Sequence, residues 1–541
     1  MEPGSVAIAE ILRAIARDRP SAEHSVAGDR RLTWAEADDR SDRLAGVLAE
    51  AGLGCFEERP ALARHRSGQH HLGILTHNRL EYLESMIGSW KARVAPFNIN
   101  YRYGPSELEH LLTLAAASAL VVQGCLADRV AGLIDRLPDL RIVLQIDDGS
   151  GAALIPGALD YEEAIAASTG APTDRIPSPD DLYLLFTGGT TGLPKGVMWR
   201  NGDAVTECFN GSRKARDLSD FVAAADTGLR SLPAAPFMHG AGHWSAIRAL
   251  LGGGTVIVPR HDGRLDPDAV WSTVDREQVN LMLIVGDAFA RPLIDAFDDG
   301  DYDGSSLNVL VTGGAALSPG VARRLLDRLP TLMIVDGFGS SEAGGQMTRV
   351  TTSGNPDTPG FKVNDRTLVL SEDRSRLLAP GDPEAGWLAR SGRLPLGYLN
   401  DQEATDLTYP TIAGARLVVP GDRARVLADG TVHLLGRESG CINTGGEKVF
   451  AQEVELAVVG LPGIADCLVV GTPDERWGRV VTAIVEPLPE ETIDLDLLRS
   501  GLDGVIADYK IPRRLIVVER VERGPNGKAD YRWAEELAGA G

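Results

Sequence analysis

The sequence has little of what marks several protein classes. Five cysteines occur among 541 residues, and no two of them form a Cys-x-x-Cys pair, so neither a zinc site nor a disulfide framework is expected. No apolar run approaches the roughly 18 residues that cross a bilayer. The N-terminal Met-Glu-Pro-Gly lacks the basic and apolar regions of a signal peptide. We therefore expect a soluble, cytoplasmic protein with no integral membrane segment.

Basic residues are scarce relative to acidic ones. Lys and Arg number 54 against 76 Asp and Glu, which gives a formal net charge of -22. A protein that neutralises nucleic-acid phosphates normally carries a basic surface, so no nucleic-acid partner is expected. Any anionic ligand must instead meet locally placed cations, backbone N–H groups or a metal.

What is present is a globular composition, with 43% hydrophobic and 24% charged residues, and a regular alternation of short apolar strands with helices. This alternation predicts parallel sheets in an α/β fold. Thr33 and Glu36 form a predicted capping box at the start of a helix. The expected strands cover 72–75, 119–122, 142–144, 255–258, 281–285, 309–311 and 332–335, and a further apolar strand begins at Leu182. The expected helices cover 7–16, 81–90, 106–112, 130–137, 319–328 and 531–537.

The composition and the pattern of strands and helices change towards the C-terminus. Residues 380–399 are rich in Gly, Pro and short strands, which predicts a small β-rich piece. A compact αβ pattern restarts after the Gly-containing segment 436–440. We predict an N-terminal domain over 1–436 and a C-terminal domain over 437–541.

The strongest chemical signal is a strand that runs into a loop of glycines, threonines and one lysine. Glycine lets the backbone approach a phosphate closely, while exposed N–H groups and Thr hydroxyls donate to phosphate oxygens and Lys195 adds a positive charge. The loop is not a Walker A motif, because GxxxxGK[ST] cannot be aligned on it. The predicted phosphate-binding residues are Thr187, Gly188, Gly189, Thr190, Thr191, Gly192 and Lys195.

This string resembles the signature phosphate loop of the adenylate-forming superfamily, which includes acyl-CoA synthetases, luciferases and peptide-synthetase adenylation domains. Gly188 replaces the usual Ser, which removes one hydroxyl donor and keeps the backbone N–H. Further segments that resemble the family's motifs follow in the family's order over nearly the whole chain. The resemblance implies a large N-terminal domain of stacked α/β subdomains plus a β-rich piece, followed by a small mobile α+β C-terminal domain.

Three segments resemble the family's nucleotide-binding motifs. In the segment 335–342, Phe338 takes the place of the usual Tyr that stacks on adenine, and Ser341 that of the usual Thr. Glu342 is the predicted Mg²⁺ ligand, because Mg²⁺ prefers hard carboxylate and phosphate oxygens. The loop 312–318 would lie against adenine, and Asp422 would accept the ribose hydroxyls. The implied adenine- and ribose-binding residues are Gly314, Ala315, Ala316, Asp336, Gly337, Phe338, Gly339, Ser341, Asp422 and Arg437.

The C-terminal region resembles the family's mobile domain. Ser439 lies at the hinge position, where relatives often carry Asp or Lys. The segment 442–449 resembles the stretch that lines the tunnel for the pantetheine arm of CoA, which implies that Gly445, Gly446, Glu447 and Lys448 bind CoA. The segment 524–532 resembles the loop that carries the catalytic lysine, here Lys528.

Residues 236–244 indicate where the acid substrate would bind. His239 lies where the family places an aromatic residue or His beside the acyl carboxylate. Amino-acid-activating relatives often use an Asp near here, and this segment has no acidic residue, so a free α-amino acid is disfavoured. The mixture of glycine and apolar residues predicts room for a bulky or long apolar acid. The expected acyl-pocket residues are His239, Gly240, Trp244, Val285, Gly286 and Gly313.

The resemblance implies AMP-forming acyl-CoA ligation, in which ATP, Mg²⁺ and CoA take part and the acid is long-chain, bulky and apolar, or a steroid side-chain acid. Lys528, Glu342, Thr187 and His239 would be catalytic. The alternatives are a stand-alone adenylating enzyme that loads a carrier protein, a luciferase-like oxygenase, and a non-enzymatic sensor or scaffold. The last is disfavoured because Lys528 and Glu342 are both present. A homodimer is compatible with the sequence.

Overall fold

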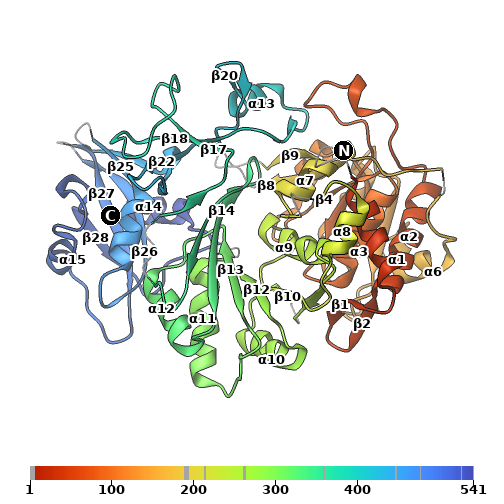
Figure 1. The fold of residues 1–541 in the computed structure, drawn as a ribbon, viewed down its shortest axis with the longest axis horizontal. Coiled ribbons are helices and arrows are strands. Elements are labelled where there is room, and N and C mark those ends of the chain that lie inside the picture. Colours follow the sequence, from red (N-terminus) through yellow and green to blue (C-terminus); the bar gives the residue numbers. More distant parts are fainter. Residues whose placement is uncertain are drawn as a thin grey trace.

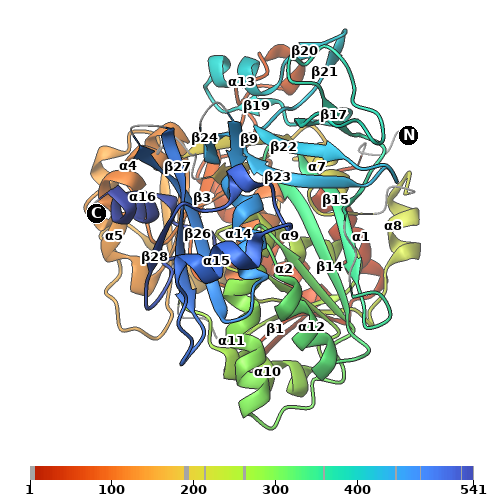
Figure 2. The same ribbon diagram turned by 90° about the vertical axis from the view of Figure 1, so that its left-hand side faces the viewer.

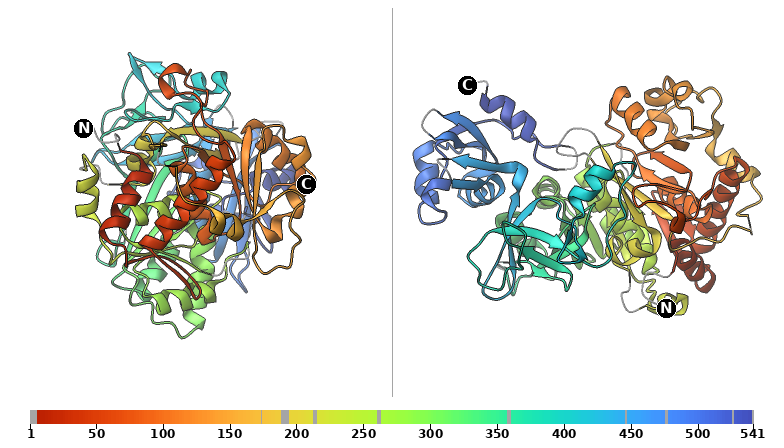
Figure 3. Two further views of the ribbon diagram at one scale, coloured as in Figure 1. Left: turned by 90° about the vertical axis from the view of Figure 1, so that its right-hand side faces the viewer. Right: turned by 90° about the horizontal axis from the view of Figure 1, so that it is seen from above.

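The computed structural model describes residues 6–172, 174–187, 194–211, 215–259, 263–356, 360–444, 447–474, 477–524 and 527–539. Seen from above, the chain starts at one end of an elongated molecule and its C-terminal part lies at the other end, with residues 230–440 between them (Figure 3). Within the described ranges, no helix has both the length and the apolar character that crossing a membrane requires.

A large mixed sheet carries the middle of the chain, with the strand order β16-β15-β14-β13-β12-β10-β11-β1-β2. Strands β10 to β14 run parallel, as the alternation of strands and helices predicts, and β15 returns antiparallel to β14. The bounds are β1 (Glu23–Ala27), β2 (Arg30–Thr33), β10 (Arg230–Pro233), β11 (Thr255–Val258), β12 (Leu281–Ile284), β13 (Val309–Gly313), β14 (Met333–Ser340), β15 (Gly344–Thr351) and β16 (Lys362–Val363).

A second large sheet belongs mainly to the N-terminal residues and has the order β19-β9-β8-β4-β3-β5-β6-β7. Its central strands are parallel, whereas β8 and β9 form an antiparallel hairpin around the predicted phosphate loop. The bounds are β3 (His71–Leu75), β4 (Ala95–Asn98), β5 (Ala117–Gln123), β6 (Ile142–Ile146), β7 (Leu159–Asp160), β8 (Leu182–Thr187), β9 (Lys195–Arg200) and β19 (Gly397–Tyr398).

Helices cover these sheets. The capping box of Thr33 and Glu36 is confirmed at the start of α2. The single helix expected over 130–137 is wrong: α5 ends at Ala131, just before Gly132, and a separate 3-10 turn, Ile134–Arg136, follows, because glycine is a poor helix former. The bounds are α1 (Ile8–Asp18), α2 (Trp34–Glu50), α3 (Leu80–Lys91), α4 (Pro105–Leu114), α5 (Asp128–Ala131), α6 (Tyr161–Ala167), α7 (Asn201–Glu207), α8 (Leu218–Ala224), α9 (Gly240–Leu251), α10 (Pro267–Glu277), α11 (Gly286–Asp299), α12 (Pro319–Arg328) and α13 (Gln402–Thr408).

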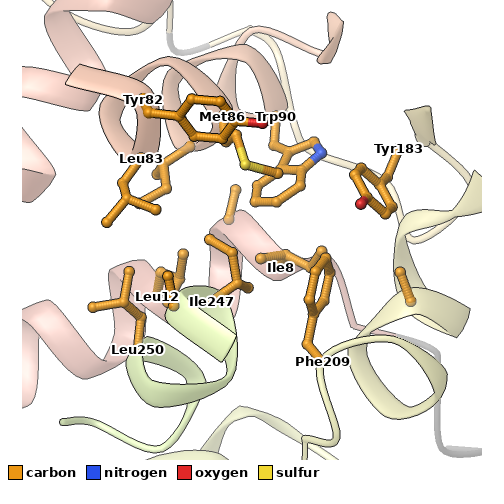
Figure 4. Packing of buried hydrophobic residues seen from close by; sticks show 14 of the residues in the cluster. Ile8, Leu12, Tyr82, Leu83, Met86, Trp90, Tyr183, Phe209, Ile247 and Leu250 are labelled. Atoms are coloured by element: carbon orange, nitrogen blue, oxygen red, sulfur yellow. The ribbon is translucent and has the colours of Figure 1, made fainter. Parts of the chain in front are cut away.

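Helix α9 packs against β10, β11 and β12 of the middle sheet, and its Trp244 donates to Tyr183 of β8 in the second sheet, so it lies between the two large sheets (Figure 1). Its Ile247 and Leu250 point into a buried cluster with Leu12 of α1 and with Tyr82 and Trp90 of α3 (Figure 4). Burial of a side chain of this size typically contributes about 1.5–3 kcal/mol. One face of α9 is therefore packed in the core. The opposite face points toward the space between α9 and strands β10–β15.

The last third of the chain forms two smaller β-containing parts. Figure 2 shows the C-terminal part, with β26, β27, β28 and helices α14–α16, facing the viewer. Its buried clusters draw on residues from Ile442 onward. This smaller part and the mixed α/β fold confirm the predicted fold class, while the boundary at 436/437 stays a prediction. The bounds are β17 (Thr367–Leu370), β18 (Gly386–Arg390), β20 (Thr411–Ile412), β21 (Ala415–Arg416), β22 (Asp422–Val426), β23 (Val432–Arg437), β24 (Cys441–Thr444), β25 (Glu447–Phe450), α14 (Ala451–Val459), β26 (Ile464–Asp474), β27 (Gly478–Pro487), α15 (Leu495–Leu502), β28 (Arg514–Val517) and α16 (Tyr531–Gly539).

Candidate functional site

A cavity of about 670 Å³ is lined by α9 on one side and by β10 and β12–β16 on the other. Its size falls in the range of small-molecule sites. Residues from the N-terminal sheet, the middle sheet and the C-terminal part meet in it. The predicted site residues that line it are Thr187, His239, Gly240, Trp244, Val285, Gly313, Gly314, Gly337, Phe338, Gly339, Ser341 and Lys528.

The start of α9 holds two histidines with different environments. His239 caps the helix and lines the cavity, and burial together with the Lys528 charge lowers the pKa of its imidazole to about 3. His239 is therefore neutral at physiological pH. His243 is fully buried: its ring contacts the Tyr183 hydroxyl, and its Nδ1 lies 2.7 Å from the Phe237 carbonyl. Trp244 donates to the same hydroxyl at 2.8 Å, so this network orients the cavity wall.

Asn98, at the end of β4, joins the start of the predicted phosphate loop to the start of α9. Its Nδ2 donates to the carbonyls of Phe186 (2.9 Å) and Met238 (2.7 Å), and its Oδ1 accepts from the Phe186 N–H at 2.8 Å. Sequence reasoning missed this residue. The available signal was a polar residue that ends an apolar strand, which does not reveal its partners.

The loop after β13 closes tightly on the start of α11. Gly286 has φ +53°, and a Cβ there would lie 2.4 Å from the Ala316 carbonyl, so the position requires glycine. The Gly286 N–H donates to the Thr312 hydroxyl at 3.0 Å. The predicted residues Gly286, Ala315 and Ala316 therefore form the support of the cavity wall, on which Val285, Gly313 and Gly314 face inward.

Lys528 enters the cavity on an arm of the C-terminal part. The arm turns through Gly527, whose φ is +71° and whose added Cβ would lie 2.9 Å from the Ala288 side chain. The Gly524 N–H donates to the Lys528 carbonyl at 2.7 Å, and Arg523 fixes the base of the turn through Asp466 at 2.6 Å. The C-terminal arm is thus docked against α11 in this structure.

Charged groups gather around Lys528. Burial lowers the pKa of its ammonium, the Arg437 guanidinium adds to that effect, and Glu342 and Asp422 oppose it. Burial also raises the pKa of the Asp422 carboxyl, against the charges of Arg437 and Lys528. One Asp422 oxygen accepts from Arg437 Nε at 3.3 Å, whereas the other, Oδ2, is buried and has no hydrogen-bond partner among the described residues. An orphaned buried acceptor of this kind fits a ligand hydroxyl.

Glu342 and Lys195 are held by two residues that the sequence did not single out. The Tyr398 hydroxyl donates to Glu342 at 3.1 Å. The Lys195 ammonium lies 3.6 Å from Asp401 and 5.2 Å from the centre of the Tyr398 ring. In the part of the chain that the structure describes, no group of three or more His, Cys, Asp or Glu could hold a metal. A cation at Glu342 would need oxygen ligands from a bound phosphate.

Asp336, which is also predicted to bind adenine or ribose, forms an ion pair with a residue of the neighbouring strand. Its carboxylate accepts from Arg349 at 2.7 Å, and burial raises its pKa while Arg349 opposes the rise. The side chain thus ties β14 to β15, and the assignment of Asp336 to adenine stays a prediction. Phe338, two residues on, lines the cavity and presents the expected aromatic ring.

The remaining predicted residues include several that the structure does not describe. Gly188, Gly189, Thr190, Thr191 and Gly192, as well as Gly445 and Gly446, lie outside the described residues. Glu447 is exposed in the β24–β25 hairpin, where Lys448 pairs with Asn443, and no described residue of this hairpin lines the cavity. Ser439 lies in the 3-10 turn Glu438–Gly440, and this turn follows Arg437.

Models of known families match most of the chain. A family described as AMP-binding enzyme matches residues 12–399, and one described as AMP-binding enzyme C-terminal domain matches residues 453–528. The second match ends on Lys528.

The chain is also similar over almost its whole length to known proteins. It is 44% identical to the medium-chain acyl-CoA ligase Mig of Mycobacterium avium, over 98% of this chain and 97% of that protein. It is 37% identical to the 3-oxocholest-4-en-26-oate–CoA ligase of Rhodococcus rhodochrous, over 94% and 92% respectively. The crystal structure of ATP-bound MatB from Rhodopseudomonas palustris superposes with a TM-score of 0.80 at 21% identity, over 98% of this chain and 99% of that one.

Proposed function

The chain belongs to the AMP-binding enzyme family, and from this premise we propose that it is an AMP-forming acyl-CoA ligase. It would convert a carboxylic acid, ATP and CoA into acyl-CoA, AMP and pyrophosphate through an acyl-adenylate. The observation that carries the proposal is that Lys528, from the C-terminal arm, lines the same cavity as Thr187, His239 and Phe338. The names of the relatives above support CoA as the acceptor.

The first half-reaction joins two anions, because the acid carboxylate must attack the α-phosphorus of ATP. A site for it must neutralise charge and fix geometry. Lys528 would lie between the carboxylate and the α-phosphate, and Lys195 and the Thr187 hydroxyl would bind the phosphates. Asp422 would accept the ribose hydroxyls with its unpartnered oxygen. His239, which is neutral, would face the acyl carboxylate without adding charge.

Mg²⁺ belongs to the same proposal. Glu342, held by the Tyr398 hydroxyl, would bind the ion together with ATP phosphate oxygens. When bound, the ion would withdraw negative charge from the phosphates that Lys195 also contacts.

The second half-reaction needs room for the CoA thiol. Lys528 of the docked arm lines the cavity, and none of the described residues of the β24–β25 hairpin does. We infer that the C-terminal part, residues 437–541, rotates about Ser439, so that Lys528 leaves and the segment 445–448 arrives to bind CoA. Domain rotation of this kind is a common way to separate two chemical steps.

The acid is proposed to be long, or bulky and apolar, a class that includes steroid side-chain acids. The wall residues Leu281, Leu283 and Val311 are apolar, and the two relatives are named for medium-chain and steroid acids. The expected homodimer and cytoplasmic location rest on sequence reasoning. Light scattering of the purified protein tests the first and fractionation of the native cell tests the second.

The direct test is product analysis by mass spectrometry after incubation with ATP, Mg²⁺, CoA and single acids. The panel runs from acetate through octanoate and hexadecanoate to aryl and steroid side-chain acids. Acyl-CoA together with AMP is the expected result. Accumulated acyl-AMP without a thioester would favour a carrier-protein acceptor, and light emission or O₂ consumption would favour a luciferase-like oxygenase. No adenylate from any acid would overturn the proposal.

A further inference from the structure

The cavity continues well beyond the groups that surround Lys528. Helix α9 lines it from Gly240 through Trp244 and Ser245 to Arg248 and Ala249. Gly240 and Arg248 are eight residues apart, which is about 12 Å along a helix axis. The core-facing residues Ile247 and Leu250 lie on the other side of the same helix (Figure 4), so Arg248 is turned away from the core and towards the cavity.

The facing sheet runs over the same length. Val285 directly follows β12, and Leu281 lies at the start of that strand, about 13 Å away in an extended chain. Ser231 of β10 pairs with Leu281, and both line the cavity. The Leu229 carbonyl accepts from the Thr255 N–H at 2.8 Å, just past the C-terminal end of α9. Arg248 therefore lies at the strand-start end of the cavity, with Leu229, Ser231 and Leu281.

In the part of the chain that the structure describes, Arg248 is a cation without a counter-ion. Its side chain is exposed by surface area, yet the surrounding protein lowers the pKa of its guanidinium, and no charged group offsets this effect. Such a combination is expected of a side chain that faces an internal cavity. Among the described residues Arg248 has no hydrogen-bond or ion-pair partner. Glu207, the acidic residue on the same lining, is already paired with Arg390 and Arg366.

One buried polar side chain at this end also lacks a partner in the described part of the chain. Ser231 is fully buried, and its hydroxyl has no hydrogen-bond partner within the described ranges. Buried polar groups in native proteins are usually paired, so an apolar tail alone would leave this end of the cavity poorly matched.

We propose that Arg248 binds an oxygen acceptor, a carbonyl or a carboxylate, at the end of the acid opposite the reacting carboxylate. This inference rests on the proposed function, because it assumes that the carboxylate at the Lys528 end is the one that is activated. The substrate class is then a long apolar acid that carries an oxygen function at its far end. A guanidinium suits this task because its planar fork of donors matches a carboxylate or a carbonyl and stays charged at all working pH values.

The test compares three acids at each chain length from octanoic to hexadecanoic: the methyl-ended acid, the dicarboxylic acid and its monomethyl ester. They present no acceptor, an anionic acceptor and a neutral acceptor at the far end. At the length that reaches Arg248, Arg248→Met is expected to lower kcat/KM for the dicarboxylic acid by roughly 10- to 100-fold. The ester should lose less, and the methyl-ended acid should change by less than about threefold.

Two further variants separate a subsite from a structural effect. Arg248→Lys should keep most of the activity with the dicarboxylic acid and lose more with the ester, because an ammonium is a point charge without the planar fork. Arg17→Met removes an exposed arginine of α1 and should alter none of the three substrates. An equal loss with all three acids in Arg248→Met, or no effect on the dicarboxylic acid at any length, would overturn the proposal.

A binding measurement keeps this inference separate from the proposed function. Titration calorimetry of dodecanedioate and dodecanoate into the full-length protein needs no turnover. Weaker binding of dodecanedioate to Arg248→Met, with unchanged binding of dodecanoate, would support the subsite even if no thioester were ever formed. Unchanged binding of both by the variant would contradict the subsite while leaving ligase activity with methyl-ended acids intact.

Discussion

The two ends of the cavity differ in composition and in origin. At the reacting end, Lys528, Asp422, Arg437 and Glu342 come from separate segments, and their charges act on one another. At the remote end a single cation, Arg248, lies among Leu229, Ser231 and Leu281 with no charged partner among the described residues. Under the two proposals above, the reacting end would carry out a reaction that is common to many acids, and the remote end would distinguish among acids.

The largest expected effect is a loss of adenylation when the reacting end loses its lysine. Lys528→Ala should reduce acid-dependent pyrophosphate release by at least about 100- to 1,000-fold, because it removes the cation from between two anions. The same variant should form acyl-CoA from supplied acyl-AMP at a near-normal rate, because the arm must leave before that step. Single-turnover assays of both half-reactions measure the difference.

Arg532→Ala is the matched control, since it removes an exposed cation from the helix that follows Lys528. It should leave both half-reactions unchanged. Equal losses in the two half-reactions of Lys528→Ala would contradict the rotation of the C-terminal part, and an intact first half-reaction would remove Lys528 from the catalytic residues.

The next effect concerns the nucleotide side of the reacting end. Asp422→Asn should raise the KM for ATP by roughly tenfold or more, because a hydrogen bond to a charged group is weakened. The wild-type protein should have a higher kcat/KM for ATP than for deoxyadenosine triphosphate. This preference for ATP should be smaller in Asp422→Asn. Steady-state kinetics with both nucleotides test this, and unchanged discrimination would assign the ribose to another residue.

A third prediction concerns the support of the Lys528 arm. Glu455 of α14 accepts from the Tyr531 hydroxyl at 3.0 Å, and burial raises the pKa of its carboxyl to about 7 from 4.5. The native carboxyl keeps its proton in this window while the unfolded chain has lost it, so stability falls as the pH rises from about 4.5 to about 7. The shift corresponds to at most about 3 kcal/mol.

Glu455→Gln should remove this part of the pH dependence, and Glu535→Gln, an exposed carboxyl of α16, should not. Melting temperatures of the three proteins between pH 5 and 8 give the comparison. A wild-type slope that persists unchanged in Glu455→Gln would rule out Glu455 as its source.

The smallest expected effect lies away from both ends. Thr33→Ala removes the capping box of α2 and should lower stability by about 1 kcal/mol. The ratio of kcat/KM for dicarboxylic and methyl-ended acids should stay as it is in the wild type. A changed ratio would mean that the selectivity assigned to Arg248 responds to general loss of stability, which would weaken the contrast between the two ends.

Sequence reasoning was most accurate where a pattern is local. The strand at 255–258 and the helix at 319–328 agree with β11 and α12 to the residue, because period and capping are set by neighbours along the chain. The helix predicted over 130–137 was wrong, because the apolar periodicity continues past Gly132 although the helix does not. At the site, motif segments supplied Thr187, Phe338 and Lys528, and the cavity brings these together.

The sequence by itself determined the alternation of strands and helices, the resemblance to one superfamily and the segments that carry its reaction, since each is encoded in a few adjacent residues. Only the tertiary structure decided that Asn98 joins segments 88 and 140 residues away, and that Tyr398 holds Glu342. In the sequence, Arg248 is an ordinary basic residue in the last turn of a helix. It becomes a candidate specificity determinant because packing fixes one face of α9 in the core and leaves the other face at the cavity, a relation between distant segments that no local pattern records.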